Sequence, residues 1–415
     1  MRKTFKDYLV VLFGTGLGRG LSFLSSVIVA RTLGPENFGK FSIFFVVSVL
    51  TWLLPQAFDT SYVRFAKTST LTEEKNEFLR SAVFLKLIYG FIVVVFSYPL
   101  SVILARYVFK RPDVQWLLGF ALVSGVFQSF LMSVASIFQE KENFGRFAFV
   151  YSFYTGLIFI LLLFLSISHL VVTLSQVIWV YFVSSVTVGF FSLAAIWLKK
   201  LKRQWRLDKE SIRKTFHLSK WAFGTGVLAS FFPRLDMLFV TRFLEMNMVG
   251  IYSAAQQIIM VISVMTGSVA SVFLPKACRA VESAKNFAQF SKEGLLLAGL
   301  INVAVILLII FSPLAINLLY GPQYISASPI TQILLVGWFV SIFFLPFGGL
   351  FYVIDEAATR FFLEVLRWVI AVPLFLIFIP RWGGLGAAFA ISITLIIVTL
   401  VSFFCLHISL KKKIK

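Results

Sequence analysis

Twelve apolar stretches account for most of this 415-residue chain and restrict the folds that it can adopt. A helix needs about 20 apolar residues to cross a bilayer. Charged residues make up 13% of the chain, whereas soluble domains contain about 25%. The sequence therefore predicts an all-α polytopic membrane protein without a soluble domain. The twelve predicted spans are 8–30, 38–58, 81–104, 116–138, 148–168, 176–198, 219–241, 250–274, 294–317, 330–353, 361–380 and 384–408.

Basic residues are concentrated in alternate loops, which predicts the orientation of the chain. The net charge is +20, from 38 basic and 18 acidic residues. If the N-terminus lies inside, the inner segments contain 27 basic residues and the outer loops contain 7. Cytoplasmic loops of membrane proteins collect Lys and Arg. We therefore expect both termini to lie in the cytoplasm.

Short motifs recur at a common offset, which predicts an internal duplication. Phe13-Gly14-Thr15-Gly16 returns at 223–226, and parts of 29–42 return at 240–253, offset by 210 to 211 residues. Halves with an even number of spans have the same orientation, so a pseudo-twofold axis along the membrane normal should relate them. We predict a six-helix lobe at 1–198 and another at 219–415, with a cavity between them.

The linker between the predicted lobes, residues 199–218, is basic and amphipathic. Its apolar residues among many Lys and Arg favour a helix lying on the anionic inner leaflet. A solvated linker that follows the positive-inside pattern explains the same charges. Both interpretations remain open from the sequence.

Arg19, inside the first predicted span, is the first candidate site residue. If the helix enters the membrane near Tyr8, Arg19 lies roughly 17 Å inside, at about 1.5 Å per residue. An arginine at this depth costs at least ~2.5–3.5 kcal/mol, so it should face a wet cavity or a partner. Gly14, Gly18 and Ser22 form a stripe of small residues that would let a neighbouring helix approach closely.

Arg234 and Asp236 lie in the seventh predicted span, directly after Pro233. The proline should bend this helix, because it removes a backbone hydrogen bond. Together, Arg19 and Arg234 could bind phosphate, since guanidinium groups bind phosphate oxygens in a bidentate manner. An offset of 211 places Arg19 opposite Ser230, so such a site would be asymmetric.

Other polar residues in the spans complete the candidate set. Glu364 and Arg367 share a helix face, which favours a structural ion pair. Lys86 could extend to the inner surface, because a lysine stem can lie along apolar neighbours. The amide side chains could bind sugar hydroxyls or could only fasten helices together. The predicted substrate-binding residues are Arg19, Arg234, Asp236, Lys86, Arg367, Gln256, Gln257 and Gln56, with Gln128 and Asn302 as further polar candidates.

Motifs for catalysis, cofactors or metals are scarce. The sequence contains no Walker lysine motif, no His-Glu-x-x-His and no Asp-x-Asp pair. The three histidines, His169, His217 and His407, fall in different loops or span ends, and two cysteines do not make a disulfide framework. We therefore expect no enzyme activity, no cofactor and no metal site.

Residues 29–42, Val-Ala-Arg-Thr-Leu-Gly-Pro-Glu-Asn-Phe-Gly-Lys-Phe-Ser, carry a family resemblance, supported by 61–66, 138–141 and 383–388. The chain resembles the polysaccharide flippases of the multidrug/oligosaccharidyl-lipid/polysaccharide exporter superfamily. The resemblance implies two six-helix bundles in the bacterial inner membrane that move undecaprenyl-diphosphate-linked oligosaccharides outward by alternating access. It also implies partners: a polymerase, a chain-length regulator, and a proton or monovalent cation gradient. Lipid II flippases of this superfamily have two further helices, so the resemblance does not extend to that substrate.

An ion-coupled multidrug antiporter of the same superfamily is the main alternative. It would need buried carboxylates for drug and ion, and Asp236 and Glu364 are the only acidic residues that the sequence places deep in a span. A glycosyltransferase or polymerase would need catalytic residues in an external loop, yet loops 169–175 and 318–329 contain no acid. A non-enzymatic scaffold would not need charges buried in its spans.

The orientation can be tested by labelling single cysteines in a background that lacks Cys278 and Cys405. We expect a membrane-impermeant thiol reagent to label Gln323→Cys in intact cells, because loop 318–329 is predicted to be external. Lys202→Cys should react only after permeabilisation. If only Lys202→Cys were labelled in intact cells, the orientation would be the opposite of the predicted one. The prediction that the two halves have the same orientation would then lose its basis.

Overall fold

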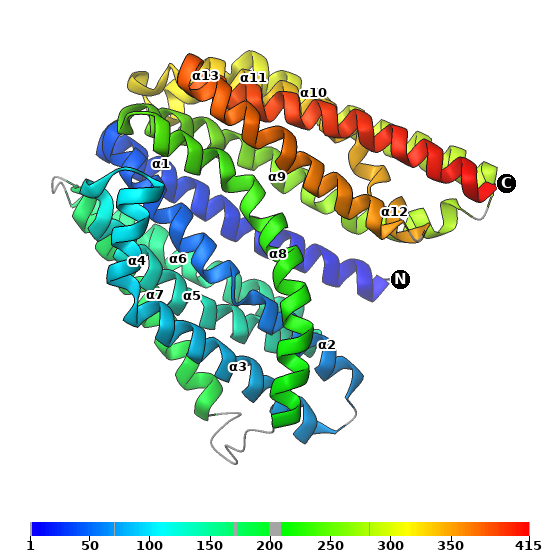
Figure 1. Cartoon of the computed structure of the whole chain (residues 1–415), viewed down its shortest axis with the longest axis horizontal. Helices are drawn as coiled ribbons and strands as arrows, with labels where there is room; N and C mark the ends of the chain where they lie inside the picture. Colours follow the sequence, from blue (N-terminus) through cyan, green and yellow to red (C-terminus); the bar gives the residue numbers. More distant parts are fainter. Residues whose placement is uncertain are drawn as a thin grey trace. The chain divides into compact units, whose positions relative to one another are not determined.

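The protein is described by a computed structural model that covers residues 2–69, 71–168, 172–198, 209–281, 283–354 and 356–414. Every secondary-structure element in these ranges is a helix, as Figure 1 shows. The chain forms two compact units, Met1–Leu238 (unit 1) and Phe239–Lys415 (unit 2). The first half of the predicted linker, 199–208, lies outside the described residues, and the second half forms the start of α8.

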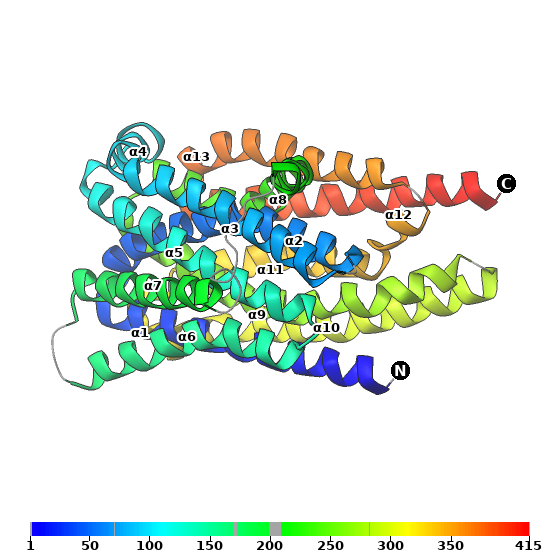
Figure 2. The ribbon, with the colours of Figure 1, turned by 90° about the horizontal axis from the view of Figure 1, so that it is seen from below.

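Unit 1 is built around α1, a 52-residue helix that packs on α5 and α6, while α5 also packs on α7. Figure 2 shows α3, α5 and α7 running side by side. The helices of this unit are α1 (Arg2–Leu53), α2 (Gln56–Thr68), α3 (Thr72–Val95), α4 (Ser97–Ile103), α5 (Gln115–Glu140), α6 (Phe144–Ile167), α7 (Leu174–Ile196) and most of α8 (Lys209–Phe243).

In unit 2, α11 lies at the centre and packs on α9, α10 and α13. Its helices are α9 (Met246–Ala280), α10 (Ala284–Tyr320), α11 (Ala327–Phe344), the short α12 (Leu350–Val353) and α13 (Ala357–Ile414). Short 3₁₀ turns at Pro322–Tyr324 and Leu345–Phe347 precede and follow α11.

The predicted spans fall on these helices. Each of the two longest helices, α1 and α13, contains two neighbouring predicted spans. The first two spans make up α1, which bends at Gly34 with φ 72°, and the last two make up α13, which bends at Gly383 with φ 58°. Glycine tolerates positive φ at little steric cost, so each bend separates two helices without a loop. Among the described residues, eight helices are long and apolar enough to cross a membrane. The predicted all-α polytopic architecture is confirmed.

The stripe of small residues in the first span lies against α6, as predicted. A β-carbon on Gly18 would lie 3.0 Å from Ser152 Oγ, and one on Gly14 would overlap Ala148. Because neither glycine has a side chain, the backbones approach closely enough for Ser152 Oγ to donate a hydrogen bond of 2.6 Å to the Gly14 carbonyl. This contact holds α1 on α6.

Side chains of adjacent helices replace backbone hydrogen bonds that prolines remove. Pro55 has no N–H for the Thr51 carbonyl, and Tyr89 of α3 donates to that oxygen at 2.8 Å. In unit 2, Pro313 has no N–H for the Ile309 carbonyl, which accepts from Gln332 Nε2 of α11 at 3.1 Å and from Ser312 Oγ of its own helix at 3.0 Å. At both prolines, a side chain of a packed helix therefore bonds to the carbonyl that lost its partner.

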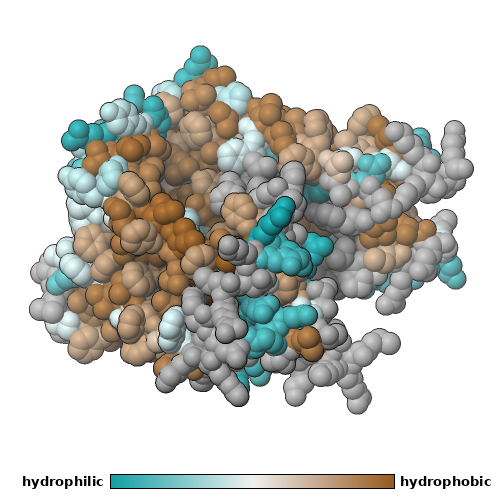
Figure 3. Space-filling view, turned by 60° about the horizontal axis from the view of Figure 1, so that its bottom comes forward, coloured by the Kyte–Doolittle hydropathy of each residue, from teal (hydrophilic) through white to brown (hydrophobic). Residues whose placement is uncertain are grey.

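Large apolar side chains remain exposed along the long helices, as expected for lipid contact. Phe91 of α3, Phe164 of α6 and Leu318 of α10 are each about 70% exposed, at 71%, 72% and 69%. Figure 3 shows one face of the molecule, on which hydrophobic side chains cover much of the described surface. A soluble protein rarely exposes apolar patches of this extent, so the surface supports a location in a membrane.

The close contact between α5 and α1 predicts the effect of a one-carbon change at Gly125. In Gly125→Ala the new β-carbon would lie 2.5 Å from the Ser48 carbonyl oxygen, so backbone must move. We expect a loss of about 1–3 kcal/mol, the usual cost of overpacking. Gly299→Ala is the matched control, because nothing lies within 4 Å of its β-carbon position. Thermal unfolding of both variants in detergent should separate them, and equal midpoints would contradict the close packing.

Candidate functional site

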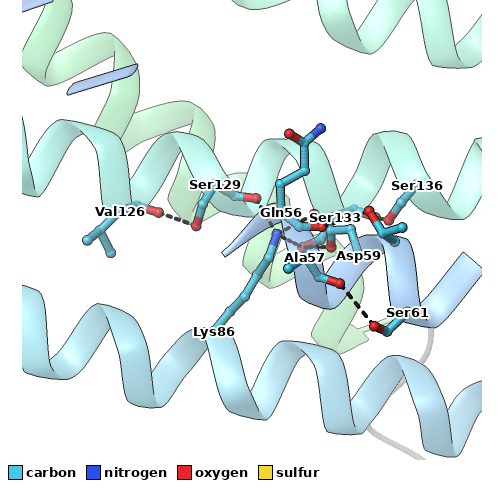
Figure 4. Close-up of polar contacts among 10 residues, drawn as sticks. Gln56, Ala57, Asp59, Ser61, Lys86, Val126, Ser129, Ser133 and Ser136 are labelled. Carbon is cyan, nitrogen blue, oxygen red and sulfur yellow. Dashed lines mark hydrogen bonds and ion pairs between the residues drawn. The ribbon is translucent and has the colours of Figure 1, made fainter. Parts of the chain in front are cut away.

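The membrane-spanning part of unit 1 contains a buried ion pair between Asp59 of α2 and Lys86 of α3 (Figure 4). Lys86 Nζ lies 2.5 Å from Asp59 Oδ2 and also donates to the Ser129 carbonyl and Ser133 Oγ of α5, both at 2.8 Å. Ser133 Oγ donates to Asp59 Oδ1 at 3.0 Å. The side chains of Lys86 and Asp59 are 0% and 8% exposed. All three donors of the ammonium group are used, and the pair joins three helices.

This arrangement corrects two expectations from the sequence. Lys86 does not extend to the inner surface, because its ammonium group is fully bonded inside the protein. Asp59 is a further buried acidic residue, where the sequence indicated only Asp236 and Glu364, because residues 56–68 form α2, which packs on α3 and α5. The only sequence signal for the pair was a lysine inside a span, which needs a partner.

Further ionisable groups lead from the pair toward the end of α5. Tyr62, one turn after Asp59, is buried and interacts electrostatically with both Asp59 and Glu140. Glu140 Oε1 accepts a hydrogen bond of 3.1 Å from Lys75 Nζ, and the Lys75 side chain is 32% exposed. Apolar side chains, including Leu79 of α3 and Ile196 of α7, pack around Tyr62.

Arg19 of α1 is half-buried beside the α6 contact. It forms no hydrogen bond or ion pair in the described part of the chain. Gly16 and Gly20, close to it on the helix, face open space, whereas Gly18 faces Tyr151 and Ser152 of α6. Within the described residues, no acidic group balances the charge of Arg19, which lies in a segment apolar enough to cross a membrane, where charges are costly.

Arg234 and Asp236 lie near the end of the α8 segment that belongs to unit 1. Arg234 is half-buried and interacts electrostatically with Asp236 and with Tyr151 of α6. Asp236 is 3% exposed, and its Oδ1 accepts from the Met237 N–H at 2.8 Å. Tyr151 is thus a neighbour both of Arg234 and of Gly18, the residue before Arg19. Sequence reasoning did not identify Tyr151, which carries no signal of its own in an aromatic-rich span.

Two candidate residues of unit 2, Arg367 and Gln256, form hydrogen bonds within that unit. Arg367 Nη1 donates to Glu364 Oε2 at 2.9 Å, which confirms the predicted ion pair. Arg360 Nη2 lies 3.0 Å from the other oxygen of Glu364, so one carboxylate links two arginines. Gln256 Nε2 donates to the Tyr252 hydroxyl at 3.1 Å, while Gln257 is half-buried.

The remaining expectations concern Gln56 and metals. Gln56 is exposed at the start of α2, three residues before Asp59, and Figure 4 shows its side chain beside the buried pair. In the part of the chain that the structure describes, no group of His, Cys, Asp and Glu is arranged to hold a metal ion. His169 lies outside the described residues, and the structure does not describe the side chain of His217.

Comparison with solved structures defines the class of protein to which this fold belongs. The fold matches "Lipid II flippase MurJ, inward closed conformation" with a TM-score of 0.78 at 19% identity, covering 96% of this chain and 87% of that one. It matches an inward-facing multidrug resistance MATE family transporter of the MOP superfamily with a TM-score of 0.77 at 17% identity, covering 98% of both chains. The chain therefore has the fold of the MOP-superfamily transporters, and at these identities the likeness extends to the fold alone.

The chain belongs to the family described as "Polysaccharide biosynthesis protein", whose profile matches residues 4–281. This confirms the resemblance carried by residues 29–42. A Shigella flexneri protein named "Putative O-antigen transporter" is 22% identical over 191 residues, 45% of each chain. The chain thus spans less than half the length of this curated relative.

The buried pair predicts a specific pattern of stability changes. Lys86→Met alone leaves the Asp59 carboxylate buried without its partner, and we expect a loss of about 3–5 kcal/mol. The double variant Asp59→Asn/Lys86→Met removes both charges and should recover most of this loss. Lys40→Gln, which breaks the exposed Lys40–Glu36 pair of 2.8 Å, should cost less than about 1 kcal/mol. Thermal unfolding in detergent measures all three, and a wild-type midpoint for Lys86→Met would contradict the pair.

Proposed function

We propose that this protein is a flippase of the bacterial inner membrane, with both termini in the cytoplasm. It moves an undecaprenyl-diphosphate-linked oligosaccharide from the cytoplasmic to the outer leaflet by alternating access, for assembly of a surface polysaccharide. A polymerase and a chain-length regulator act on its product. Family membership and the MOP-superfamily fold support transport of this class of molecule.

The unbalanced charge of Arg19 is the observation that carries the proposal. Arg19 has no partner in the described part of the chain, and Arg234 belongs to the same unit. Arg234 interacts with Asp236, so Arg19, Arg234 and this carboxylate together carry a net positive charge. Guanidinium groups bind phosphate oxygens through two parallel hydrogen bonds. A lipid diphosphate is an anion that can reach these arginines from within a membrane and balance their positive charge.

The other candidate residues have supporting roles in this proposal. Lys86 is saturated by Asp59 and α5, so we assign it to the fold and not to the substrate. Arg367 holds Glu364 and stabilises the first half of α13. Gln56, Gln256 and Gln257 remain proposed contacts for sugar hydroxyl groups.

A multidrug antiporter is the second candidate, favoured by the MATE transporter of similar fold and by two buried carboxylates. A cationic drug needs a carboxylate whose charge is available. Asp59 is bonded to Lys86, and Asp236 interacts with Arg234. The basic neighbours of both acids favour an anionic substrate over a cationic one.

Alanine substitution of the two arginines tests the site. Charge-assisted hydrogen bonds contribute about 1.5–3 kcal/mol each, so Arg19→Ala or Arg234→Ala should weaken substrate binding roughly 10- to 100-fold. Lysine at either position should rescue only partly, because it keeps the charge but loses the bidentate geometry. The measurement is translocation of a fluorescent undecaprenyl-diphosphate oligosaccharide in proteoliposomes, with polymer export in cells as a second readout.

Arg146→Ala is the matched control, because this arginine is exposed on α6 and lies over the Phe138 ring at 5.8 Å. It should transport at the wild-type rate per molecule. Normal transport by Arg19→Ala and Arg234→Ala at wild-type protein levels would rule out the proposed site. Loss of transport only through loss of folded protein would assign both arginines to structure.

A further inference from the structure

Three basic residues lie close together in the sequence, in the predicted outer loop that follows α3. Arg106, Lys110 and Arg111 are three of the seven basic residues that the predicted outer loops contain, and Asp113 is the one acidic residue between 96 and 115. The positive-inside pattern depletes outer loops of Lys and Arg. It therefore does not explain why three of them are concentrated in this loop.

This loop contains a helical segment that packs on α5. After α3, the chain continues as α4 and then as a short π-helix, η1 (Leu104–Val108). Figure 2 shows α4 nearly end-on, whereas α3, α5 and α7 run across the view, so α4 lies at a steep angle to them. Ser101, Ala105 and Phe109 are buried at intervals of four residues. Ser101 faces Gly119 of α5, so one side of the segment is fixed on that helix.

The rest of this segment exposes aromatic and basic side chains together. Tyr98 and Tyr107 are each 72% exposed, and Ile103 is also exposed. Arg106 and Lys110 are exposed as well, and neither side chain forms a hydrogen bond or an ion pair with the described residues. Amphipathic helices of this composition lie in the interface of a membrane, because their apolar side chains enter the lipid while their basic side chains attract anionic headgroups.

Neighbouring residues place the segment at the level of the lipid headgroups. Phe91 and Val95 are exposed near the end of α3, so the lipid-facing side of that helix leads directly to α4. Trp116 and Trp179, near the starts of α5 and α7, are exposed and both lie against the Phe120 ring. Trp and Tyr are enriched where the hydrocarbon core meets water. Basic side chains at this level can reach lipid phosphate groups.

The backbone at Lys110 gives a second indication that its side chain has a role. Its φ is 54°, a conformation that glycine adopts at lower cost and that usually ends a helix as Gly or Asn. The Arg111 N–H donates to the Ala105 carbonyl at 2.7 Å and closes the end of η1. This bond does not involve the Lys110 side chain, so glycine would form the same turn. Residues held in sparsely populated conformations are frequent at ligand sites.

We propose that α4 and η1, together with Lys110, form a binding site for an anionic phospholipid, which lies in the outer leaflet under the predicted orientation. Arg106 and Lys110 bind the lipid phosphate, while Tyr98, Ile103 and Tyr107 lie among the glycerol and upper acyl-chain atoms. The unpaired basic side chains favour an anionic lipid over a zwitterionic one. The continuity with the lipid-facing side of α3 favours a lipid over a soluble anion. This site is separate from the proposed substrate site.

Photo-crosslinking in nanodiscs tests the site. The purified protein is reconstituted in phosphatidylcholine with a trace of photoreactive phosphatidylglycerol or of photoreactive phosphatidylcholine with the same acyl chains, and adducts are mapped by mass spectrometry. Phosphatidylglycerol should label residues 96–111 more strongly. Arg106→Gln and Lys110→Gln should each reduce these adducts about fivefold, the preference that one basic residue near an anionic surface gives. Adducts of phosphatidylcholine should not change, and Arg106→Lys should keep the preference.

Arg381→Gln is the matched control, because this exposed arginine lies beside the exposed Trp382 in the last predicted outer loop and is not part of such a segment. It should leave the adducts at 96–111 unchanged. Equal labelling by the two lipids would overturn the site. An equal loss in Arg381→Gln would also overturn it, because the effect would then come from the overall charge of the protein.

A transport measurement separates this lipid site from a substrate site. In vesicles of phosphatidylcholine alone, Arg106→Gln/Lys110→Gln should move the fluorescent undecaprenyl-diphosphate oligosaccharide at the wild-type rate. Loss of transport in these vesicles would assign both residues to the substrate and overturn the phospholipid site. If the wild-type protein moves no lipid-linked oligosaccharide, the proposed substrate is wrong, and the cross-linking still decides the phospholipid site.

Discussion

The dominant constraint on this molecule is that polar groups inside a membrane find no water and must find partners in the protein. Backbone groups meet this constraint by forming helices. Where proline removes a bond, a neighbouring helix supplies one, as Tyr89 does for the Thr51 carbonyl and Gln332 does for the Ile309 carbonyl. Helix packing in this protein is therefore also a means of satisfying backbone carbonyls.

Charged side chains in the spans fall into two groups under the same constraint. Lys86 and Arg367 are bonded to carboxylates, so their charges are balanced locally. Arg19 has no such partner in the described part of the chain. A charge that the fold leaves unbalanced at this depth persists only if it contacts water or a ligand of opposite charge. This distinction assigns Lys86 and Arg367 to the fold and leaves Arg19 as a candidate binding residue.

Much of the fold could be predicted from the sequence, because hydropathy and small-residue spacing are local properties. The spans, the approach of α6 to Gly14 and Gly18, and the Glu364–Arg367 pair each follow from residues within one or two helical turns. Asp59 could not be found in this way. Its neighbours 59–80 include many polar residues, which indicates a loop, and only the packing of α2 on α3 and α5 buries it. The interaction of Tyr151 with Arg234 is equally non-local, since it joins residues 83 positions apart on α6 and α8.

The predicted duplication makes the distribution of charge informative. Duplicated halves begin with equivalent residues, and local features persist: Ser42 Oγ donates to the Phe38 carbonyl at 2.8 Å, and Ser253 Oγ donates to the Val249 carbonyl at 2.7 Å, one offset of 211 later. The charges have not persisted in the same way. Arg19, Asp59 and Lys86 all belong to unit 1, and the offset gives each an uncharged counterpart. Under the predicted duplication, the counterparts of Asp59 and Lys86 are uncharged, so the helical pattern that the two halves share does not account for the buried pair in unit 1.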